Sequence, residues 1–110
     1  MRIGTLAHAA GVTAKTVRFY ERAGLLPEPP RTPSGYRDYP PESADRLAFI
    51  RGAQVAGLSL SEIRDVLSVR DSGQAPSGRT AALIAGHLRQ VEARLEDLTR
   101  TRNALRDLAP

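Results

Sequence analysis

The chain has 110 residues with a formal net charge of +4 at pH 7, and 41% of its residues are hydrophobic but only 5% aromatic. That length allows one compact domain plus one extended element, and no apolar run reaches the roughly 20 residues that a membrane span requires. Because the sequence contains no cysteine, it excludes disulfides, thiolate metal sites and a cysteine nucleophile. The first residues do not form the apolar core of a secretory signal, so we expect a cytoplasmic protein without membrane contact.

The positive charge is concentrated near the N-terminus. Residues 1–40 hold six basic and three acidic groups, whereas residues 41–110 hold ten and nine. An excess of cations permits a polyanionic partner, so nucleic-acid contacts are expected in the first forty residues.

Two short helices joined by a turn are expected first. One runs from Thr5, a candidate N-cap, to Ala10. Gly11 then supplies the turn, and Thr13 can cap a second helix that ends near Gly24. Both helices lie in the most basic part of the chain.

The spacing of Ala7, Gly11 and Val17 is typical of a helix-turn-helix. The small residue lets the second helix approach closely, the glycine permits a tight turn and the valine seals the pair. Such a spacing also arises by chance, so the charge pattern of the second helix decides its interpretation.

A stripe of cations lies along that second helix. At 100° per residue, Lys15, Arg18 and Arg22 fall within about 60° of one another and point away from Val17. The stripe suits insertion into a DNA major groove, where arginine pairs with guanine edges and all three cations neutralise phosphates. Phe19 lies beside it, and an exposed ring there is easier to explain against DNA than against water. The alternative is a solvated charged face.

Four prolines within residues 26–34 exclude a helix there. Ser34-Gly35 is a turn signal, and the residues around it suit a short two-stranded hairpin. A hairpin would present Arg31, Tyr36 and Arg37 at one edge, as a wing that straddles the phosphate backbone. The alternative is an ordinary surface turn with Tyr36 packed inward.

Two more helices are expected after the wing. The third runs from Pro40-Pro41 to about Ala56, with Gly57 as its stop. Ser59-Leu60-Ser61-Glu62 has the form of a capping box and starts the fourth. The positions expected to face inward are Leu47, Ile50, Leu60, Ile63, Val66 and Leu67.

A polar linker over residues 71–78 precedes a long final helix, about Arg79 to Leu108. Its apolar residues recur in steps of three and four, which is a heptad seam of about three and a half repeats interrupted by Arg102. A seam this long on so small a chain favours self-association as a coiled-coil homodimer over packing along its own domain. The seam consists of Ala81, Ile84, Leu88, Val91, Leu95, Leu98 and Leu105.

The sequence shows no arrangement for catalysis or for binding a cofactor. Its only histidines, His8 and His87, have no carboxylate or second histidine spaced to complete a metal site, and nucleophile and nucleotide-binding motifs are absent. We therefore expect neither an enzyme nor a bound metal or cofactor.

Ordered motifs over roughly residues 2–70 resemble the MerR family of regulators, and the similarity continues in type through the final helix. The motifs are Thr5-Leu6-Ala7, Gly11-Val12, Thr16-Val17-Arg18-Phe19-Tyr20-Glu21, Gly24-Leu25-Leu26-Pro27, Gly35-Tyr36-Arg37, Leu47, Phe49-Ile50, Gly57-Leu58-Ser59-Leu60 and Glu62-Ile63. The resemblance implies a mainly α-helical protein with a winged helix-turn-helix DNA-binding domain in residues 1–70, a linker in residues 71–78 and a long antiparallel coiled-coil helix in residues 79–108. It also implies a homodimer that bends and untwists over-long promoter spacers for RNA polymerase.

The resemblance assigns DNA contacts to particular residues. Lys15, Thr16 and Arg18 would face the groove, and backbone N–H groups at Ser59 would bind a phosphate at the start of the fourth helix. Phosphate contacts are implied for Tyr20, Arg31, Tyr36, Arg37 and Arg51.

Two departures from the family pattern matter. The family often has tyrosine where this chain has Phe19, so a hydroxyl contact is lost. Metal-sensing members have cysteines near the start of the dimer helix and in a loop after it, whereas here residues 74–78 contain none and Pro110 ends the chain. If Ser77 occupies the cysteine position, sensing through a thiolate is lost.

The leading hypothesis is a sequence-specific transcriptional regulator that binds a palindromic promoter operator as a homodimer and has a minimal or absent effector domain. One alternative is an architectural or recombination-associated protein that bends DNA without controlling transcription. Another is a protein-interaction module on the same body, which the basic stripe argues against.

Overall fold

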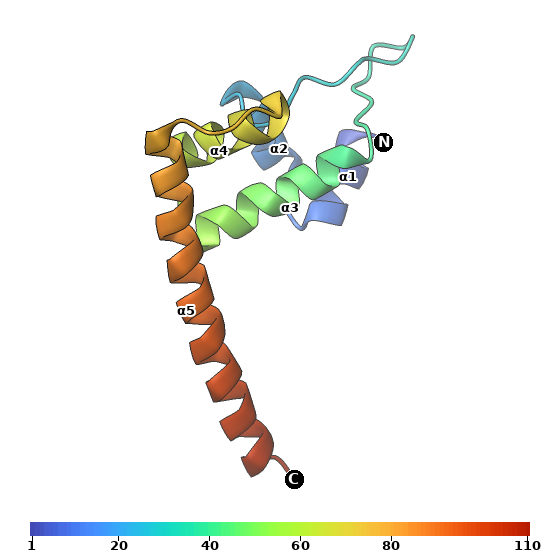
Figure 1. Ribbon diagram of the computed structural model, residues 1–110. Helices are drawn as coiled ribbons and strands as arrows, with labels where there is room; N and C mark the ends of the chain where they lie inside the picture. Colours follow the sequence, from blue (N-terminus) through green and yellow to red (C-terminus); the bar gives the residue numbers. More distant parts are fainter. The chain divides into compact units, whose positions relative to one another are not determined.

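The computed structural model describes residues 1–110 and contains five helices but no strand. It divides into two compact units, Met1–Ser68 and Val69–Pro110. The first holds α1 (Ile3–Ala10), α2 (Ala14–Arg22), α3 (Glu42–Val55) and most of α4 (Leu60–Ser72), and the second holds the end of α4 and α5 (Gly78–Leu108) (Figure 1). The expected mainly helical fold is confirmed. None of these helices combines the length and the apolar composition that a membrane span needs.

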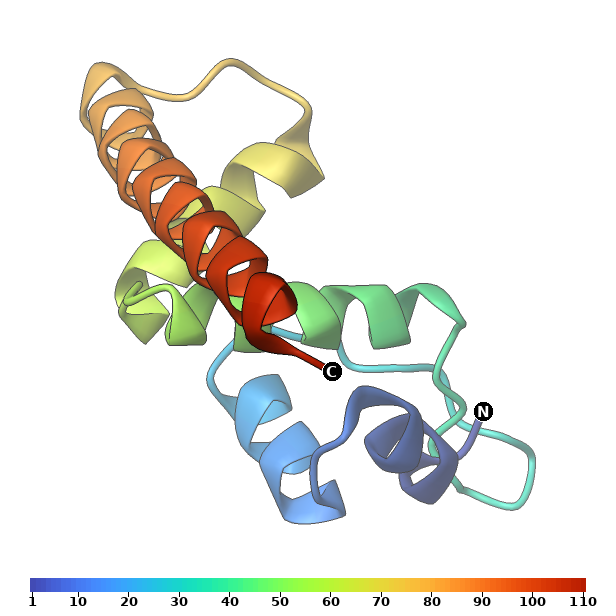
Figure 2. The same ribbon diagram turned by 90° about the horizontal axis from the view of Figure 1, so that it is seen from below.

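The core of the first unit draws on every helix in it. α1 packs against both α2 and α3, and Figure 2 shows α1 and α2 side by side next to α3. The expected inward residues Ile63 and Leu67 of α4 are buried, whereas Leu60 and Val66 are only half-buried. The side chains with 2% exposure or less are Leu6, Val17, Leu25, Leu26, Tyr39, Leu47, Ile50, Ile63 and Leu67.

The turn between α1 and α2 forms as predicted. Gly11 has φ +67°, a left-handed conformation that residues with a side chain rarely adopt, and the Val12 N–H donates to the Ala7 carbonyl (2.9 Å). Thr13 caps α2, because its hydroxyl accepts from the Thr16 N–H (3.1 Å). Local sequence therefore sets the direction in which α2 leaves the turn.

The predicted start of α1 at Thr5 is wrong. The helix begins at Ile3, after Arg2 in an extended conformation, and no side chain caps it. The segment before α1 is fixed from far along the chain, because the Tyr39 N–H donates to the Met1 carbonyl (2.7 Å). A contact over that separation moves the helix start without leaving a local capping signal.

The segment after α2 forms a loop instead of the predicted two-stranded hairpin. It contains one isolated antiparallel bridge, between Arg31 and Arg37, and we call residues 31–37 the wing loop. The bonds that flank the bridge are Thr32 N–H to the Tyr36 carbonyl (2.7 Å) and Asp38 N–H to the Pro30 carbonyl (2.8 Å). A ladder cannot extend past Pro30, because proline has no N–H to return a second bond.

The ends of α3 and α4 follow the sequence signals. Gly57 has φ +97° just after α3, as expected for a helix stop. The capping box closes in both directions: the Ser59 N–H donates to Glu62 Oε1 (2.8 Å), and the Glu62 N–H donates to Ser59 Oγ (3.1 Å). α4 continues to Ser72, so it takes in the first two residues of the expected linker.

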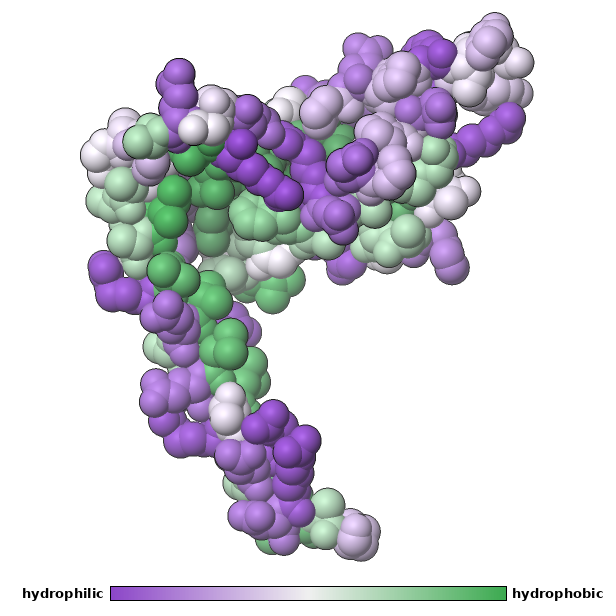
Figure 3. All heavy atoms as spheres, turned by 45° about the vertical axis from the view of Figure 1, so that its right-hand side comes forward, coloured by the Kyte–Doolittle hydropathy of each residue, from purple (hydrophilic) through white to green (hydrophobic).

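The long final helix is confirmed. α5 has 31 residues, and the Ser77 hydroxyl caps it by accepting from the Thr80 N–H (3.3 Å). No residue of α5 is buried. Hydrophobic side chains gather along one side of the helix (Figure 3), which leaves an unusually apolar surface for an exposed helix.

We expect Gly11→Ala to destabilise the first unit by about 1–2 kcal/mol, because alanine is strained at φ +67° and its Cβ would lie 3.1 Å from Arg51 Nη1. Gly52→Ala in α3 is the matched control. Its added Cβ would meet open space on a helical backbone, so a gain of about 0.5–1 kcal/mol is expected. Urea unfolding measures both free energies, and a stabilising Gly11→Ala would contradict the strained turn.

Candidate nucleic-acid interface

α2 has one cationic side in solvent and one apolar side in the core. Lys15, Arg18 and Arg22 are exposed, whereas Val17 is fully buried and Tyr20 is 5% exposed. The predicted stripe is therefore accessible along its whole length. The packing behind it holds the helix that carries the cations, which is what insertion into a groove requires.

Two uncharged side chains flank the stripe. Phe19 is 43% exposed, and its ring centroid lies 5.7 Å from that of Tyr20. Thr16 is half-buried, and its hydroxyl lies 3.0 Å from the Thr13 hydroxyl within the N-cap of α2. Phe19 thus offers an apolar surface beside the cations, while the Thr16 hydroxyl is engaged in the cap.

Tyr20 does not fit the phosphate contact that the resemblance implies. Its side chain is buried, and its hydroxyl donates to Gln54 Oε1 on α3 (2.6 Å). A ring held in the core cannot reach a phosphate outside the protein. Tyr20 instead fastens α2 to α3, and its burial follows from its position on the same side of α2 as Val17.

The wing loop brings three of the predicted contact residues together. Arg31 Nη1 donates to the Gly35 carbonyl (2.8 Å), which holds the side chain across the turn. Tyr36 is 54% exposed, so the alternative in which its ring packs inward is wrong. The guanidinium carbon of Arg2 lies 4.3 Å from the centroid of the Tyr36 ring, in a cation–π contact. Arg37 is half-buried at the end of the loop.

A buried carboxylate connects the wing loop to α2. The Glu21 side chain is 9% exposed, and its two oxygens accept from Arg37 Nε (3.3 Å) and from the Tyr39 hydroxyl. Glu21 lies one helical turn after Arg18, so the same segment carries the stripe and the anchor. Sequence reasoning missed Glu21 and Tyr39 as site residues. Glu21 could have been found, because it is the one acidic residue in the cationic α2.

The environment of Tyr39 keeps its hydroxyl protonated. Burial raises the pKa of Tyr39 well above the ordinary value of 10, and the hydrogen bond to Glu21 and the charge of Glu21 raise it further. The positive charges of Arg37 and Arg18 act in the opposite direction without overcoming these effects. The hydroxyl therefore remains a donor to Glu21.

Arg51 and Ser59 lie outside the α2 stripe and the wing loop. Arg51 is exposed on α3, and its Nη1 donates to the Ala10 carbonyl (3.0 Å) at the end of α1. The N–H and hydroxyl of Ser59 are both used in the capping box. A phosphate at the start of α4 would therefore have to bind the unpaired N–H groups that follow Ser59 in the first turn.

Two family models match the chain: "MerR HTH family regulatory protein" over residues 1–69 and "MerR, DNA binding" over residues 44–108. The chain belongs to the MerR family. It is a DNA-binding transcriptional regulator, as its motifs predict, and the matched models cover both the cationic α2 and the long α5.

Curated relatives agree with this assignment to the MerR family. The chain is 41% identical over 107 residues to the mercuric resistance operon regulatory protein of Bacillus cereus, covering 97% of this chain and 81% of the relative. It is 37% identical over 108 residues to the transcriptional regulator ZntR of Escherichia coli K12, covering 97% and 77%. These relatives are transcriptional regulators and not enzymes.

Solved structures of the MerR type share the fold. PbrR691 of Ralstonia metallidurans CH34, in complex with lead(II), is 40% identical with a TM-score of 0.70, over 98% of this chain and 84% of that one. HiNmlR, a MerR family regulator lacking the sensor domain and bound to promoter DNA, is 24% identical with a TM-score of 0.71, over 96% and 83%. The second similarity concerns the fold alone.

The Tyr39–Glu21 contact predicts a loss of stability at alkaline pH. Because folding raises the pKa of Tyr39 above 10, the unfolded chain ionises first, so the free energy of unfolding is maintained below about pH 9 and falls as the pH rises beyond 10. Tyr39→Phe should cost about 1 kcal/mol near neutral pH, because it removes the hydrogen bond, but should show a shallower alkaline decline.

Denaturant unfolding between pH 8 and pH 11.5 measures both effects. Tyr36→Phe, which removes an exposed hydroxyl, is the control and should keep the decline of the unmodified protein. If Tyr39→Phe declines as steeply as that control, the hydroxyl does not carry the effect.

Proposed function

We propose that this MerR-family regulator binds a palindromic promoter operator as a homodimer and distorts the promoter spacer for use by RNA polymerase. The observation that carries the proposal is α2, with three exposed cations on one side and a fully buried apolar side behind them. Similarity to a mercuric resistance operon regulatory protein and to the transcriptional regulator ZntR favours control of transcription over a purely architectural role. We place this action in the cytoplasm, where bacterial DNA lies.

Each part of the chain has its own role in the proposed function. Residues 1–70 form the DNA-binding domain, residues 71–78 the linker and residues 79–108 the dimerisation helix, in keeping with the two compact units. Lys15, Thr16 and Arg18 face the major groove, with Phe19 against bases or sugars and Arg22 on phosphate. The backbone contacts outside α2 come from Arg31, Tyr36, Arg37, Arg51 and the first turn of α4 after Ser59.

Exposure along α5 supports the homodimer. Leu88, Leu95, Leu98 and Leu105 are each between 54% and 62% exposed, while Ile84 and Val91 are half-buried. Such a row of leucines has to be covered to be stable in water. A second copy offers a matching row, and it also places two α2 helices on the two halves of a palindrome.

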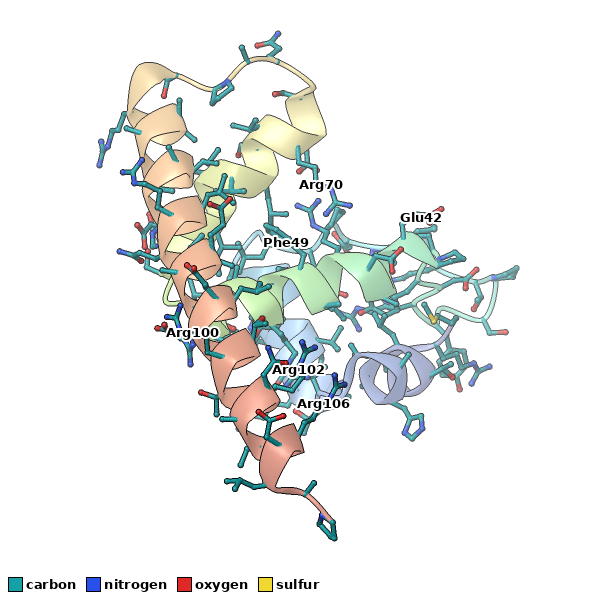
Figure 4. The ribbon with its side chains drawn as sticks, turned by 60° about the horizontal axis from the view of Figure 1, so that its bottom comes forward. Glu42, Phe49, Arg70, Arg100, Arg102 and Arg106 are labelled. Carbon is teal, nitrogen blue, oxygen red and sulfur yellow. The ribbon has the colours of Figure 1, made fainter.

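Charged side chains limit the apolar row toward the C-terminal end of α5. Figure 4 shows Arg100, Arg102 and Arg106 projecting from this part of the helix. Arg100 pairs with Glu96 (3.6 Å) and with Asp97 on its own helix. Arg102 occupies a seam position and so interrupts the apolar row between Leu98 and Leu105, and its side chain donates to Asn103 Oδ1 (3.2 Å).

The signal that controls this regulator is proposed to differ from a thiolate-bound metal. Residues 1–110 contain no cysteine, so thiolate ligands cannot come from them, and the residue that caps α5 is Ser77. The similarity to PbrR691 and to mercuric regulators therefore extends to the DNA-binding and dimerisation parts without their metal chemistry.

We expect Lys15→Ala and Arg18→Ala each to weaken operator binding about 5- to 100-fold, because each removes a contact to a base edge or a phosphate in the groove. Fluorescence anisotropy with operator DNA at several salt concentrations measures affinity and salt slope. Arg79→Ala in the first turn of α5 removes the same charge from an exposed site and should have little effect. Unchanged binding in both α2 variants would contradict the proposed readout helix.

Leu95→Glu is expected to convert the dimer to monomer, because it places a charge in the middle of the apolar row. Sedimentation velocity at micromolar protein measures the change. Gln90→Glu adds the same charge at an exposed position of α5 outside the seam and should leave the dimer intact. A dimer that survives Leu95→Glu would mean that another surface holds the copies together.

A further inference from the structure

A hollow of about 560 Å³ lies between the start of α1 and the wing loop. Arginine side chains from three separate points in the chain meet there, and no carboxylate is among the lining residues. The lining consists of Arg2, Ile3, Gly4, Thr5, Arg31, Gly35, Tyr36 and Arg37. A concentration of cations without a counter-charge inside the hollow calls for an anion.

The three arginines are held in place by the protein. Arg31 is tied to the Gly35 carbonyl (2.8 Å), and Arg37 uses its Nε for Glu21 (3.3 Å). Arg2 lies over the Tyr36 ring, with its guanidinium carbon 4.3 Å from the centroid. Glu21 offsets the charge of Arg37, whereas Arg2 and Arg31 have no carboxylate among the residues that line the hollow, so a ligand or solvent has to compensate their charges.

The N-terminus of α1 carries the partial positive charge of the helix dipole, and no acidic side chain in its first turn offsets that charge. The first bond of the helix runs from the Leu6 N–H to the Arg2 carbonyl (3.0 Å), no side chain caps the preceding N–H groups, and the first turn has no acid. The carboxylate of the neighbouring Asp38 is already engaged by the Met1 nitrogen (2.9 Å). The helix end therefore adds to the positive potential of the three arginines.

We propose that this hollow binds a phosphodiester of the DNA backbone, with Arg2 as a contact residue beyond those assigned above. The inference rests on the proposed DNA-binding function and extends its footprint from α2 and the wing to the start of α1. The Arg2 guanidinium carbon lies over the Tyr36 ring, and a guanidinium has enough N–H donors to bind two phosphate oxygens as well. An added Cβ at Gly4 would meet nothing within 4 Å, so this side of the hollow is open to a strand passing over α1.

Two variants test the hollow, one by removing a positive charge and the other by adding a negative charge. Arg2→Ala removes one cation from each protomer and should weaken binding of the homodimer to operator DNA about 60-fold at 0.1 M salt, with a salt slope lower by about 1.8, as expected for two lost phosphate contacts. Gly4→Glu puts a carboxylate into the open side. It should weaken binding at least as much while leaving thermal stability unchanged or higher, because an acid in the first turn suits the helix and replaces a glycine.

The controls separate charge, folding and binding. Gln90→Glu adds the same negative charge at an exposed site on α5 and should retain affinity. Arg2→Lys keeps the charge and should restore most of the salt slope lost in Arg2→Ala, whereas a purely structural role of the Arg2–Tyr36 contact would lower the melting temperature without altering that slope. Circular dichroism melts accompany each binding curve.

The outcomes distinguish this inference from the function on which it rests. If Arg2→Ala and Gly4→Glu bind like Gln90→Glu while Lys15→Ala and Arg18→Ala lose affinity, the regulator binds DNA but the hollow is not a phosphate site. Loss of affinity in none of the variants overturns both proposals. The last measurement compares binding of inorganic phosphate with that of chloride at equal ionic strength. If Arg2→Ala abolishes saturable phosphate binding but keeps its affinity for DNA, the hollow binds a free anion and the proposed DNA contact is overturned.

Discussion

The carboxylate of Glu21 is the contact on which the DNA-binding surface depends. It lies on α2 and accepts hydrogen bonds from Arg37 and Tyr39, which follow the turn of the wing loop. A two-stranded hairpin would brace itself with its own backbone ladder, but this wing has a single bridge and needs an anchor outside itself. Because the anchor is on the helix that carries the cationic stripe, the largely buried Glu21 side chain ties the two cationic elements together.

Positive charge alone does not define the surface that meets DNA. Three arginines of α3 and α4 bind backbone carbonyls at the ends of earlier elements: Arg51 binds Ala10 (3.0 Å), Arg46 binds Leu25 (2.6 Å) and Arg64 binds Ala23 (2.5 Å). Each places a cation where the negative end of a helix or an adjoining turn needs a donor. These arginines join the helix pairs together, and only Arg51 among them also has a proposed phosphate contact, so a count of basic residues overstates the cations available to DNA. The cations of α2 differ, because Lys15, Arg18 and Arg22 are all exposed.

The sequence predicted the features that a few neighbouring residues decide. The left-handed turn at Gly11, the Thr13 cap and the reciprocal bonds of Ser59 and Glu62 are all local, and all three formed as expected. The missing hairpin also has a local cause, since Pro30 has no N–H to extend the ladder, but two other errors came from contacts between distant segments. The start of α1 depends on the pairing of Met1 with Tyr39, and the role of Tyr20 depends on Gln54 across the core. Helical periodicity placed Tyr20 on the inner side of α2, so weighing that geometry above the resemblance would have predicted its burial.

Operator recognition by the proposed homodimer depends on two contacts, the apolar row of α5 and the anchor at Glu21. A helix of 31 residues with no buried residue gains little from its own chain, and isolated helices are marginal in water, so a partner that covers the row would provide most of its stability. In the proposed homodimer that same partner supplies the second α2. A palindromic operator then requires a fixed distance between the two α2 helices. Flexibility within either protomer would reduce the free energy of binding. Under the proposed function, the contact of Glu21 with the wing loop therefore supports operator recognition together with the dimer contact.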